Sequence, residues 1–289
     1  MKLAQLKRSD GIHLALWREG RLIDLTTTAR KFRLPLPRNM REAIQDAALI
    51  ERIAGAGDML VEVPLAGARF APAVTPCPKL LCVGLNYRAH ADECGLGRPE
   101  APVLFAKLQN ALSAHGQPIP MPPASVQLDY EAELVIVVGR RMKCVPPERA
   151  LSHVFGYTCG NDVSARDLQS RSSQWLIGKS QDGFAPVGPW VVTADELNPD
   201  NLDIGTRVNG RWRQRANTSD MIFGCAEILS YASTMMTLEP GDLVFTGTPS
   251  GVIVGLPEKD REWLRPGDRV EIEIEGIGTL ENIVAPTDA

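Results

Sequence analysis

Three acidic residues stand at the start of a strongly apolar segment in the stretch LDYEAELVIVVG, residues 128 to 139. Asp129, Glu131 and Glu133 are spaced two apart, and side chains two apart on a β-strand point to the same face. Glu131 and Glu133 would then lie side by side, where two carboxylates repel each other. They either face water, or a cation or a shared proton holds them together. The apolar run that follows favours a strand that enters a buried sheet.

A possible proton-transfer pair lies in the stretch GLNYRAHADECG, residues 84 to 95. His90 and Glu93 are three residues apart, so they are neighbours on one face of a helix. A carboxylate beside an imidazole fixes its tautomer and makes it a better base. The pair could therefore activate water, although an exposed helix often carries such residues without using them.

Three further segments combine polar groups with turn residues. YTCGNDVSARDLQ places Asp162, Arg166, Asp167 and Gln169 close together after a Cys-Gly-Asn turn. WLIGKSQDGFAPVGPW contains Lys179, followed by residues so rich in Gly and Pro that we expect a loop. FTGTPSGV ends a strand in a Gly-rich turn, where backbone amides and the Thr248 hydroxyl could receive an anion.

Composition excludes several classes of protein. The formal net charge of -4 over 289 residues offers no basic field for a polyanion, so we expect no nucleic-acid partner. No stretch approaches the roughly 20 apolar residues of a membrane span, and the N-terminal stretch has no long apolar core like that of a signal peptide. We therefore expect no membrane partner and a cytoplasmic location.

Cysteine and histidine usage narrows the choice of metal. The six cysteines show no CxxC spacing, and the chain has only four histidines. Sites built from nitrogen and sulfur are thus disfavoured, which leaves ions with oxygen ligands, such as Mg²⁺, Mn²⁺ or Ca²⁺. Glu131 and Glu133 fit that chemistry.

The elements that must position these residues begin with a separate N-terminal part. IHLALWREGRLIDL alternates and contains a hairpin turn, and MREAIQDAALIERIAGAG follows as a helical stretch. Four prolines then interrupt any regular element and indicate a linker. We place the domain boundary near residue 75, between a small domain at 1–74 and a larger one at 75–289. The prolines are Pro64, Pro72, Pro76 and Pro78.

The larger part reads as mostly β, with few and short helices. In RVEIEIEG, Val270, Ile272 and Ile274 alternate with three glutamates, which indicates a strand with one face in the core and one in water. Helices are expected around RAHADECG, PPERALSHV and CAEILSYASTMM. The fold class is therefore α+β, mostly β.

Five motifs together resemble the fumarylacetoacetate hydrolase family, over roughly residues 75 to 286. They are NYRAHADE, DYEAELVIVVG, GNDVSARDLQ, GKSQDGFAPVGPW and LEPGDLVFTGTPSGV. The resemblance implies a mixed β-roll catalytic domain, usually a homodimer, preceded here by a small accessory domain. It also implies a divalent cation, Mg²⁺ or Mn²⁺ with Ca²⁺ as an alternative, held by Glu131, Glu133 and Asp162.

The same resemblance assigns roles to further residues. His90 and Glu93 match the family's catalytic dyad, and Lys179 matches its catalytic lysine. Gln169, Thr248 and Arg166 match substrate-binding positions, and we expect Arg166 to orient the loop of Asp162. Asp129 stays outside the ligand set, either behind the ligands or in solvent.

The function implied is that of a metal-dependent hydrolase. It would cleave a carbon-carbon bond of a 2,4-dioxo acid, such as an acylpyruvate or a 2,4-didehydro-3-deoxy-sugar acid, to pyruvate and a carboxylic acid. His90 would activate the water, and Lys179 and Gln169 would stabilise the oxyanion. The alternatives are an oxaloacetate decarboxylase, a 2-oxo acid isomerase of the same family, or a binding protein that retains only the fold.

Overall fold

The computed structural model describes residues 1–55, 59–93, 95 and 97–286, and most of its regular structure is β, as expected for the fold class. The strands are β1 (Lys2–Arg8), β2 (Gly11–Arg18), β3 (Arg21–Asp24), β4 (Glu62–Val63), β5 (Leu80–Gly84), β6 (Val103–Lys107), β7 (Leu112–Ala114), β8 (Ile119–Met121), β9 (Leu128–Asp129), β10 (Ala132–Val138), β11 (Val154–Asn161), β12 (Ser164–Ala165), β13 (Ala185–Thr193), β14 (Asp203–Val208), β15 (Arg211–Asn217), β16 (Leu243–Phe245), β17 (Arg269–Ile274) and β18 (Gly278–Pro286).

The α-helices of the described residues are short. They are α1 (Leu25–Phe32), α2 (Met40–Gln45), α3 (Ala47–Ala54), α4 (Arg88–Glu93), α5 (Pro147–Ala150), α6 (Arg166–Gln169), α7 (Leu176–Lys179) and α8 (Cys225–Met235). Among these residues, no helix has both the length and the apolar character needed to cross a membrane.

One large sheet runs through the molecule in the order β4-β3-β2-β1-β13-β11-β10-β16-β5-β6, and β7 pairs with β13 beside this path. Strand β10 is buried along its whole length. It lies between β11 and β16. Because side chains on both of its faces are buried, its sequence is a continuous apolar run instead of an alternating one.

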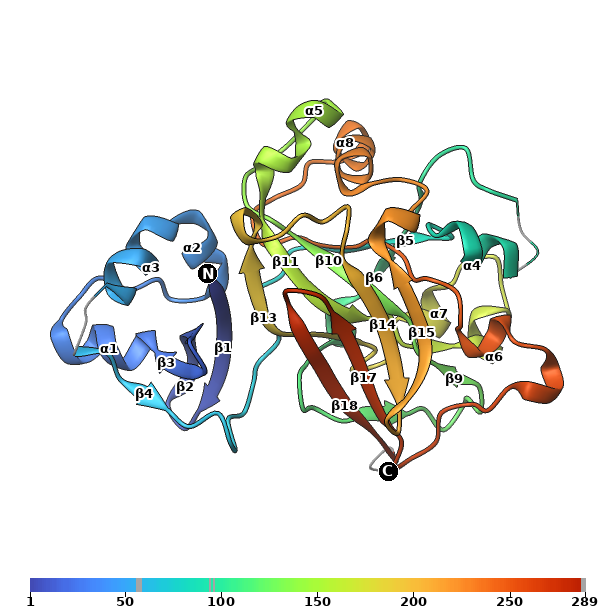
Figure 1. Ribbon diagram of the computed structural model, residues 1–289, viewed down its shortest axis with the longest axis horizontal. Helices are drawn as coiled ribbons and strands as arrows, with labels where there is room; N and C mark the ends of the chain where they lie inside the picture. The colour runs from blue at the N-terminus through green and yellow to red at the C-terminus, as the bar shows by residue number, and fades with distance from the viewer. Residues whose placement is uncertain (56–58, 94, 96, 287–289) are drawn as a thin grey trace.

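A second sheet, in the order β15-β14-β17-β18-β8, packs against the first through contacts of β10 and β11 with β14 and β17. In β17 the side chains of Val270, Ile272 and Ile274 are buried, whereas Glu271 and Glu273 are partly exposed. The alternation of this strand was therefore predicted correctly, and the core of the larger part lies between the two sheets (Figure 1).

The N-terminal strands extend the large sheet. Strand β1 pairs antiparallel with β13, with Leu3 opposite Val191. In Figure 1, β1 to β4 and α1 to α3 form the lobe at the left, next to β13. The expected hairpin between β2 and β3 turns at Glu19 and Gly20, whose φ values of 52° and 81° are both left-handed. The boundary near residue 75 stays a prediction.

Two expected elements differ in detail. Residues 185–188 were expected in a loop but belong to β13, which β7 flanks on one side and β11 on the other. The register of β13 against β11 shifts between Tyr157 and Cys159, and such a bulge tolerates prolines in a strand. The helical stretch that begins at Met40 divides at Asp46, whose side chain caps α3. Residues 56 and 57 of that stretch and Cys94 of the RAHADECG helix lie outside the described residues.

Candidate metal centre and active site

Three carboxylates meet where β10 begins and β11 ends. Glu131 directly precedes β10, Glu133 is the second residue of that strand, and Asp162 follows β11. The pairing of β10 with β11 brings these ends together, and the Asp162 N–H donates to the Glu131 carbonyl (3.0 Å). One oxygen of each carboxylate lies within 4.8 Å of the others, and all three residues are buried. Glu131 and Glu133 thus face the interior and not water.

Two buried lysines hold this cluster together. The Lys179 ammonium, at the end of α7, lies 2.8 Å from both Glu131 and Asp162. Lys107, the last residue of β6, forms an ion pair with the second oxygen of Asp162 and donates to two backbone carbonyls. Asp162 therefore has a lysine on each carboxylate oxygen, which fixes the plane of its carboxylate.

Arg166 joins the cluster to Asp129. Its guanidinium lies 2.6 Å from Glu131 and 2.9 Å from Asp129, and it donates to Gln169 (3.0 Å). Its guanidinium contacts these three side chains, and the expectation that Arg166 orients the loop of Asp162 stays a prediction. Asp129 is fully buried, so the alternative that it faces solvent was wrong.

The charges of the cluster do not balance. Within the part of the chain that the structure describes, four buried carboxylates, Asp129, Glu131, Glu133 and Asp162, have ion pairs with three buried cations, Lys107, Lys179 and Arg166. Burial raises the pKa of Glu133 well above its ordinary value, and the charges of Asp162 and Glu131 add to this. Burial also disfavours ionised Glu131, but the charges of Lys179 and Arg166 outweigh it and hold its pKa below the ordinary value. The excess negative charge of the cluster is thus concentrated at Glu133.

The donor set fits a hard divalent cation. All three candidate ligands are carboxylates, the ligands that Mg²⁺, Mn²⁺ and Ca²⁺ prefer, and a cation would offset the repulsion at Glu133. A carboxylate oxygen has more than one lone pair, so the oxygens that contact Lys179 could also bind an ion. The Gly247 N–H donates to Glu133 (2.7 Å) from a backbone with φ 95°, where a Cβ would lie 2.7 Å from the Cβ of Asn86. Glycine at 247 therefore permits the close approach that orients Glu133.

His90 and Glu93 form the expected pair on α4. His90 Nδ1 lies 2.8 Å from Glu93 Oε1, and the Gly251 N–H donates to Glu93 Oε2 (3.0 Å). A carboxylate only accepts hydrogen bonds, so this contact places a proton on Nδ1 and makes Nε2 the basic nitrogen. A Cβ at Gly255 would lie 2.6 Å from the Glu93 carboxyl carbon, so the segment 251–255 packs tightly on the pair.

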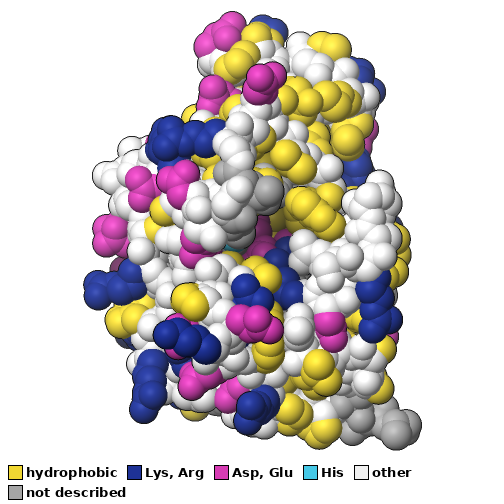
Figure 2. Space-filling model, turned by 90° about the vertical axis from the view of Figure 1, so that its right-hand side faces the viewer, with side chains coloured by type: hydrophobic (Ala, Val, Ile, Leu, Met, Phe, Trp, Pro, Cys, Tyr) yellow, Lys and Arg dark blue, Asp and Glu magenta, His cyan; other side chains and the backbone are white. Residues whose placement is uncertain are grey.

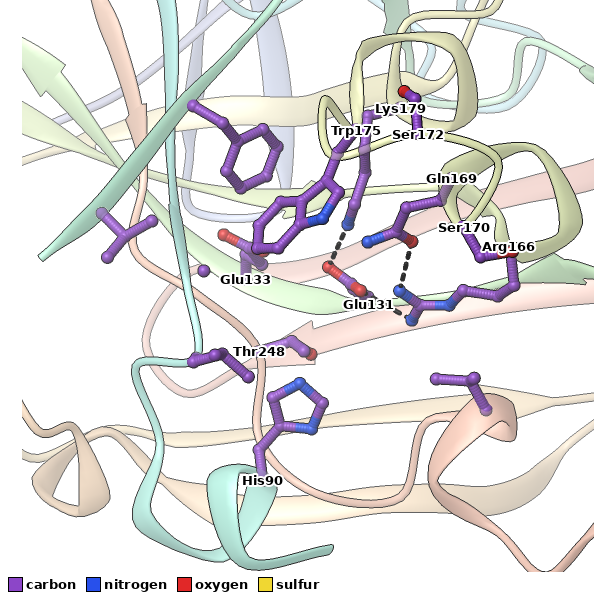
Figure 3. A pocket seen from close by; sticks show the side chains of 15 residues that line it. His90, Glu131, Glu133, Arg166, Gln169, Ser170, Ser172, Trp175, Lys179 and Thr248 are labelled. Atoms are coloured by element: carbon purple, nitrogen blue, oxygen red, sulfur yellow. Dashed lines mark hydrogen bonds and ion pairs between the residues drawn. The ribbon is translucent and has the colours of Figure 1, made fainter. Parts of the chain in front are cut away.

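His90, Glu131 and Glu133 line one cavity of about 330 Å³. Figure 2 shows this face of the molecule hollowed, with acidic, basic and His side chains in the hollow. In Figure 3, His90 lies across the cavity from Glu131, and the dashed lines join Glu131 to Lys179 and to Arg166. Every other residue assigned to substrate binding or catalysis in the sequence, apart from Glu93, also lines it: Arg166, Gln169, Lys179 and Thr248.

Several residues of the site were missed in the sequence. Trp175 and Phe105 form one wall of the cavity, and their rings pack edge to face with centroids 5.2 Å apart. Lys107 forms an ion pair with Asp162, and the signal for it was a lone lysine at the end of the apolar stretch VLFAK. Gln214 contacts Thr248 from β15, and no local pattern indicated this contact.

Asp129→Asn is expected to destabilise the protein. It removes one charge of a buried ion pair with Arg166 and weakens an acceptor of the Ile253 and Val254 N–H groups (2.9 and 3.1 Å). Breaking one partner of a buried ion pair costs about 3 to 5 kcal/mol. Urea unfolding of the purified variant measures the loss.

Asp195→Asn is the matched control, because Asp195 is exposed in the turn after β13. Its free energy of unfolding should stay within about 0.5 kcal/mol of wild type. Equal stability of the two variants would show that Asp129 does not hold the 253–254 segment and Arg166 together.

Residues 79–285 match the family model described as fumarylacetoacetate (FAA) hydrolase C-terminal. A Bos taurus protein named oxaloacetate tautomerase FAHD2B, mitochondrial, is 38% identical over 293 residues, which cover 98% of this chain and 91% of that protein.

Two solved structures are similar along the whole chain. The fumarylacetoacetate hydrolase of Exiguobacterium antarcticum has a TM-score of 0.86 and 35% identity, covering 99% of this chain and all of the other. The maleylpyruvate hydrolase of Sphingobium sp. SYK-6, in complex with manganese(II) and pyruvate, has a TM-score of 0.82 and 30% identity, covering 100% of both chains.

Proposed function

Because the chain belongs to the fumarylacetoacetate hydrolase family, we propose that it is a metal-dependent enzyme that interconverts the keto and enol forms of a small 2-oxo dicarboxylic acid such as oxaloacetate. The observation that carries the proposal is the position of His90, with Glu93 behind it, on the cavity that Glu131 and Glu133 of the carboxylate cluster also line. A base thus faces a cation site across a space suited to a small acid. The bovine tautomerase supports this substrate class, since its similarity extends over 98% of the chain.

Glu131, Glu133 and Asp162 would hold the cation, Mg²⁺ or Mn²⁺. When bound, it would act as a Lewis acid toward the 2-oxo group and stabilise negative charge on that oxygen. The Mn²⁺ and pyruvate in the Sphingobium hydrolase support both the metal and the 2-oxo acid.

His90 would carry the proton. Its Nε2 would take a proton from C3 of the keto form, and the imidazolium, stabilised by Glu93, would return it to the 2-oxygen to give the enol. Returning the proton to C3 instead regenerates the keto form. Lys179 and Gln169 line the cavity and would donate hydrogen bonds to the charge that develops on oxygen.

Hydrolysis of a 2,4-dioxo acid is the second candidate, and the whole-chain similarity to maleylpyruvate hydrolase favours it. In that reaction His90 would deprotonate a water that attacks the 4-carbonyl, and the bond between C3 and C4 would break. The products would be pyruvate, after protonation of its enolate at C3, and a carboxylic acid.

An assay with oxaloacetate, maleylpyruvate and a series of acylpyruvates tests the proposal. With Mg²⁺ or Mn²⁺ we expect faster loss of enol-oxaloacetate absorbance and no release of pyruvate, and we expect a chelator to remove the acceleration. If pyruvate is released from a 2,4-dioxo acid with a higher kcat/KM than that of tautomerisation, the protein is a hydrolase and the tautomerase proposal is wrong. Carbon dioxide and pyruvate from oxaloacetate would indicate a decarboxylase. No metal-dependent reaction with any substrate would contradict the enzyme assignment. The cytoplasmic location and the homodimer stay predictions.

A further inference from the structure

Gln214 is a buried amide that connects the second sheet to the cavity wall. It belongs to β15 and is 1% exposed. Its Nε2 donates to Thr248 Oγ1 (2.9 Å) and to the Pro249 carbonyl (2.7 Å). Its Oε1 accepts from the Ala132 N–H (3.0 Å) and from the Thr206 hydroxyl (2.6 Å). The amide therefore links Ala132, which lies between Glu131 and Glu133 in the sequence, to the Gly-rich turn that contains Thr248.

Two backbone partners fix which end of the amide is oxygen and which is nitrogen. The Ala132 N–H can only donate, so the atom that it contacts must be the oxygen of Gln214. The Pro249 carbonyl can only accept, so the atom that it contacts must be the nitrogen. Both partners give the same orientation. A flipped amide would place its NH₂ group against the Ala132 N–H and its oxygen against the Pro249 carbonyl.

This orientation fixes the role of the Thr248 hydroxyl. The two hydrogens on Gln214 Nε2 go to Pro249 and to Thr248, so Thr248 Oγ1 accepts from Gln214. A hydroxyl has one hydrogen of its own, and Thr248 cannot give it to an amide nitrogen that is already a donor. Thr248 lines the cavity, so this hydrogen is available to a ligand there.

We propose that Gln214 is a positioning residue that keeps Thr248 a hydrogen-bond donor toward the anionic carboxylate of the 2-oxo acid. The inference rests on the proposed function, because it needs an anion in this cavity. Gln214 does not touch the cavity itself; it acts by occupying the acceptor site of Thr248. The same amide bonds to the Ala132 N–H, so the donor is held in register with Glu131 and Glu133 on either side of Ala132.

Gln214→Glu is the informative substitution. The new side chain keeps an oxygen for Ala132 and Thr206, but an oxygen replaces the nitrogen that donates to Thr248. The Thr248 hydroxyl then donates to this oxygen and is lost to the ligand. The probe is oxalate, a planar dianion that resembles the enolate of a 2-oxo acid, titrated calorimetrically into the Mn²⁺-loaded protein. Loss of one hydrogen bond to a charged group predicts an oxalate Kd raised about 10- to 100-fold.

Three comparisons separate positioning from a merely structural role. Thr248→Val should raise the oxalate Kd by a similar factor, and adding Gln214→Glu to it should change the Kd no further, since both act through one hydroxyl. Thr206→Val removes a bond from the oxygen end of the same amide and should leave the oxalate Kd within about twofold of wild type. The Kd of Mn²⁺ alone should change in none of them. The proposal would be overturned if the increases in oxalate Kd multiplied in the double variant, or if Thr206→Val raised the oxalate Kd as much as Gln214→Glu does. A wild-type oxalate Kd in Gln214→Glu would also overturn it.

Neutron diffraction of the deuterium-exchanged wild-type protein tests the polarity without any substitution. We expect two deuterons on the Gln214 nitrogen, aimed at Thr248 and Pro249, and the Thr248 deuteron aimed into the cavity. A Thr248 deuteron on the Gln214 side would overturn the proposal even if Gln214→Glu failed to fold. If wild type neither binds oxalate nor acts on any 2-oxo acid, the proposed function fails; if it does both and Gln214→Glu binds normally, only this inference fails.

Discussion

Glu133→Ala is expected to abolish Mn²⁺ and Mg²⁺ binding at micromolar metal and to reduce turnover to the level of metal-free wild type. Of the three clustered carboxylates, Glu133 has no lysine or arginine partner among the described residues, and burial raises its pKa well above the ordinary value. A cation is the partner that this geometry calls for, and removing Glu133 leaves only two candidate ligands. Lewis-acid stabilisation is worth several kcal/mol, so turnover should fall by roughly 10³-fold or more. Calorimetric metal titration and the 2-oxo acid assay measure the two effects.

Glu271→Ala is the control for this variant, because Glu271 lies on the solvent side of β17. It should bind metal and turn over substrate as wild type does. Glu131→Ala and Asp162→Ala should resemble Glu133→Ala. Wild-type activity of Glu133→Ala at limiting metal would remove Glu133 from the ligand set.

His90→Ala is expected to lower kcat by about 10² to 10⁴-fold, the usual contribution of a general base. His90 lines the cavity, and Glu93 holds its Nδ1 at 2.8 Å, so the loss should fall on proton transfer. The Kd for Mn²⁺ should stay at the wild-type value, because the imidazole is not a ligand in the proposed site. Glu93→Gln should lower kcat less, since an amide still contacts the ring but stabilises the imidazolium poorly.

His153→Ala serves as the control for His90→Ala, because His153 lies in the short turn Leu151–His153, outside the cavity lining described above. It should retain wild-type kcat. A lost metal site in His90→Ala would mean that the ring ligates the cation, and a wild-type kcat would mean that another group moves the proton.

Those parts of the site that depend on local periodicity could be predicted from the sequence. The three-residue spacing of His90 and Glu93 became a contact because α4 is a helix at that point. The two-residue spacing of Glu131 and Glu133 became a shared site at the start of β10, where their carboxylates lie close together. The apolar run after them predicted a buried strand, which β10 is.

The contacts that come from distant strands could not be predicted in this way. Lys107 contacts Asp162 because β6 lies at the edge of the large sheet, next to β5. Gln214 contacts Thr248 because the second sheet packs on the first. The sequence left open whether Asp129 lies behind the metal ligands or in solvent, and its ion pair with Arg166 decides this. Strand order and sheet packing decide these contacts, and neither follows from spacing along the chain.

The pairing of β1 with β13 has a consequence for synthesis on the ribosome. Leu3 pairs with Val191, so the partner of the first strand is made about 190 residues later. At about 5 to 20 residues per second this takes roughly 10 to 40 seconds. During that time β1 can pair with β2 through the hairpin, and residues 69–71 can cover Gln5–Lys7 on its other edge. Lys2 and Leu3 have no native neighbour on that edge until β13 is made. The start of β1 in the nascent chain is therefore an open edge with which other chains could pair, and β13 is the strand that closes it.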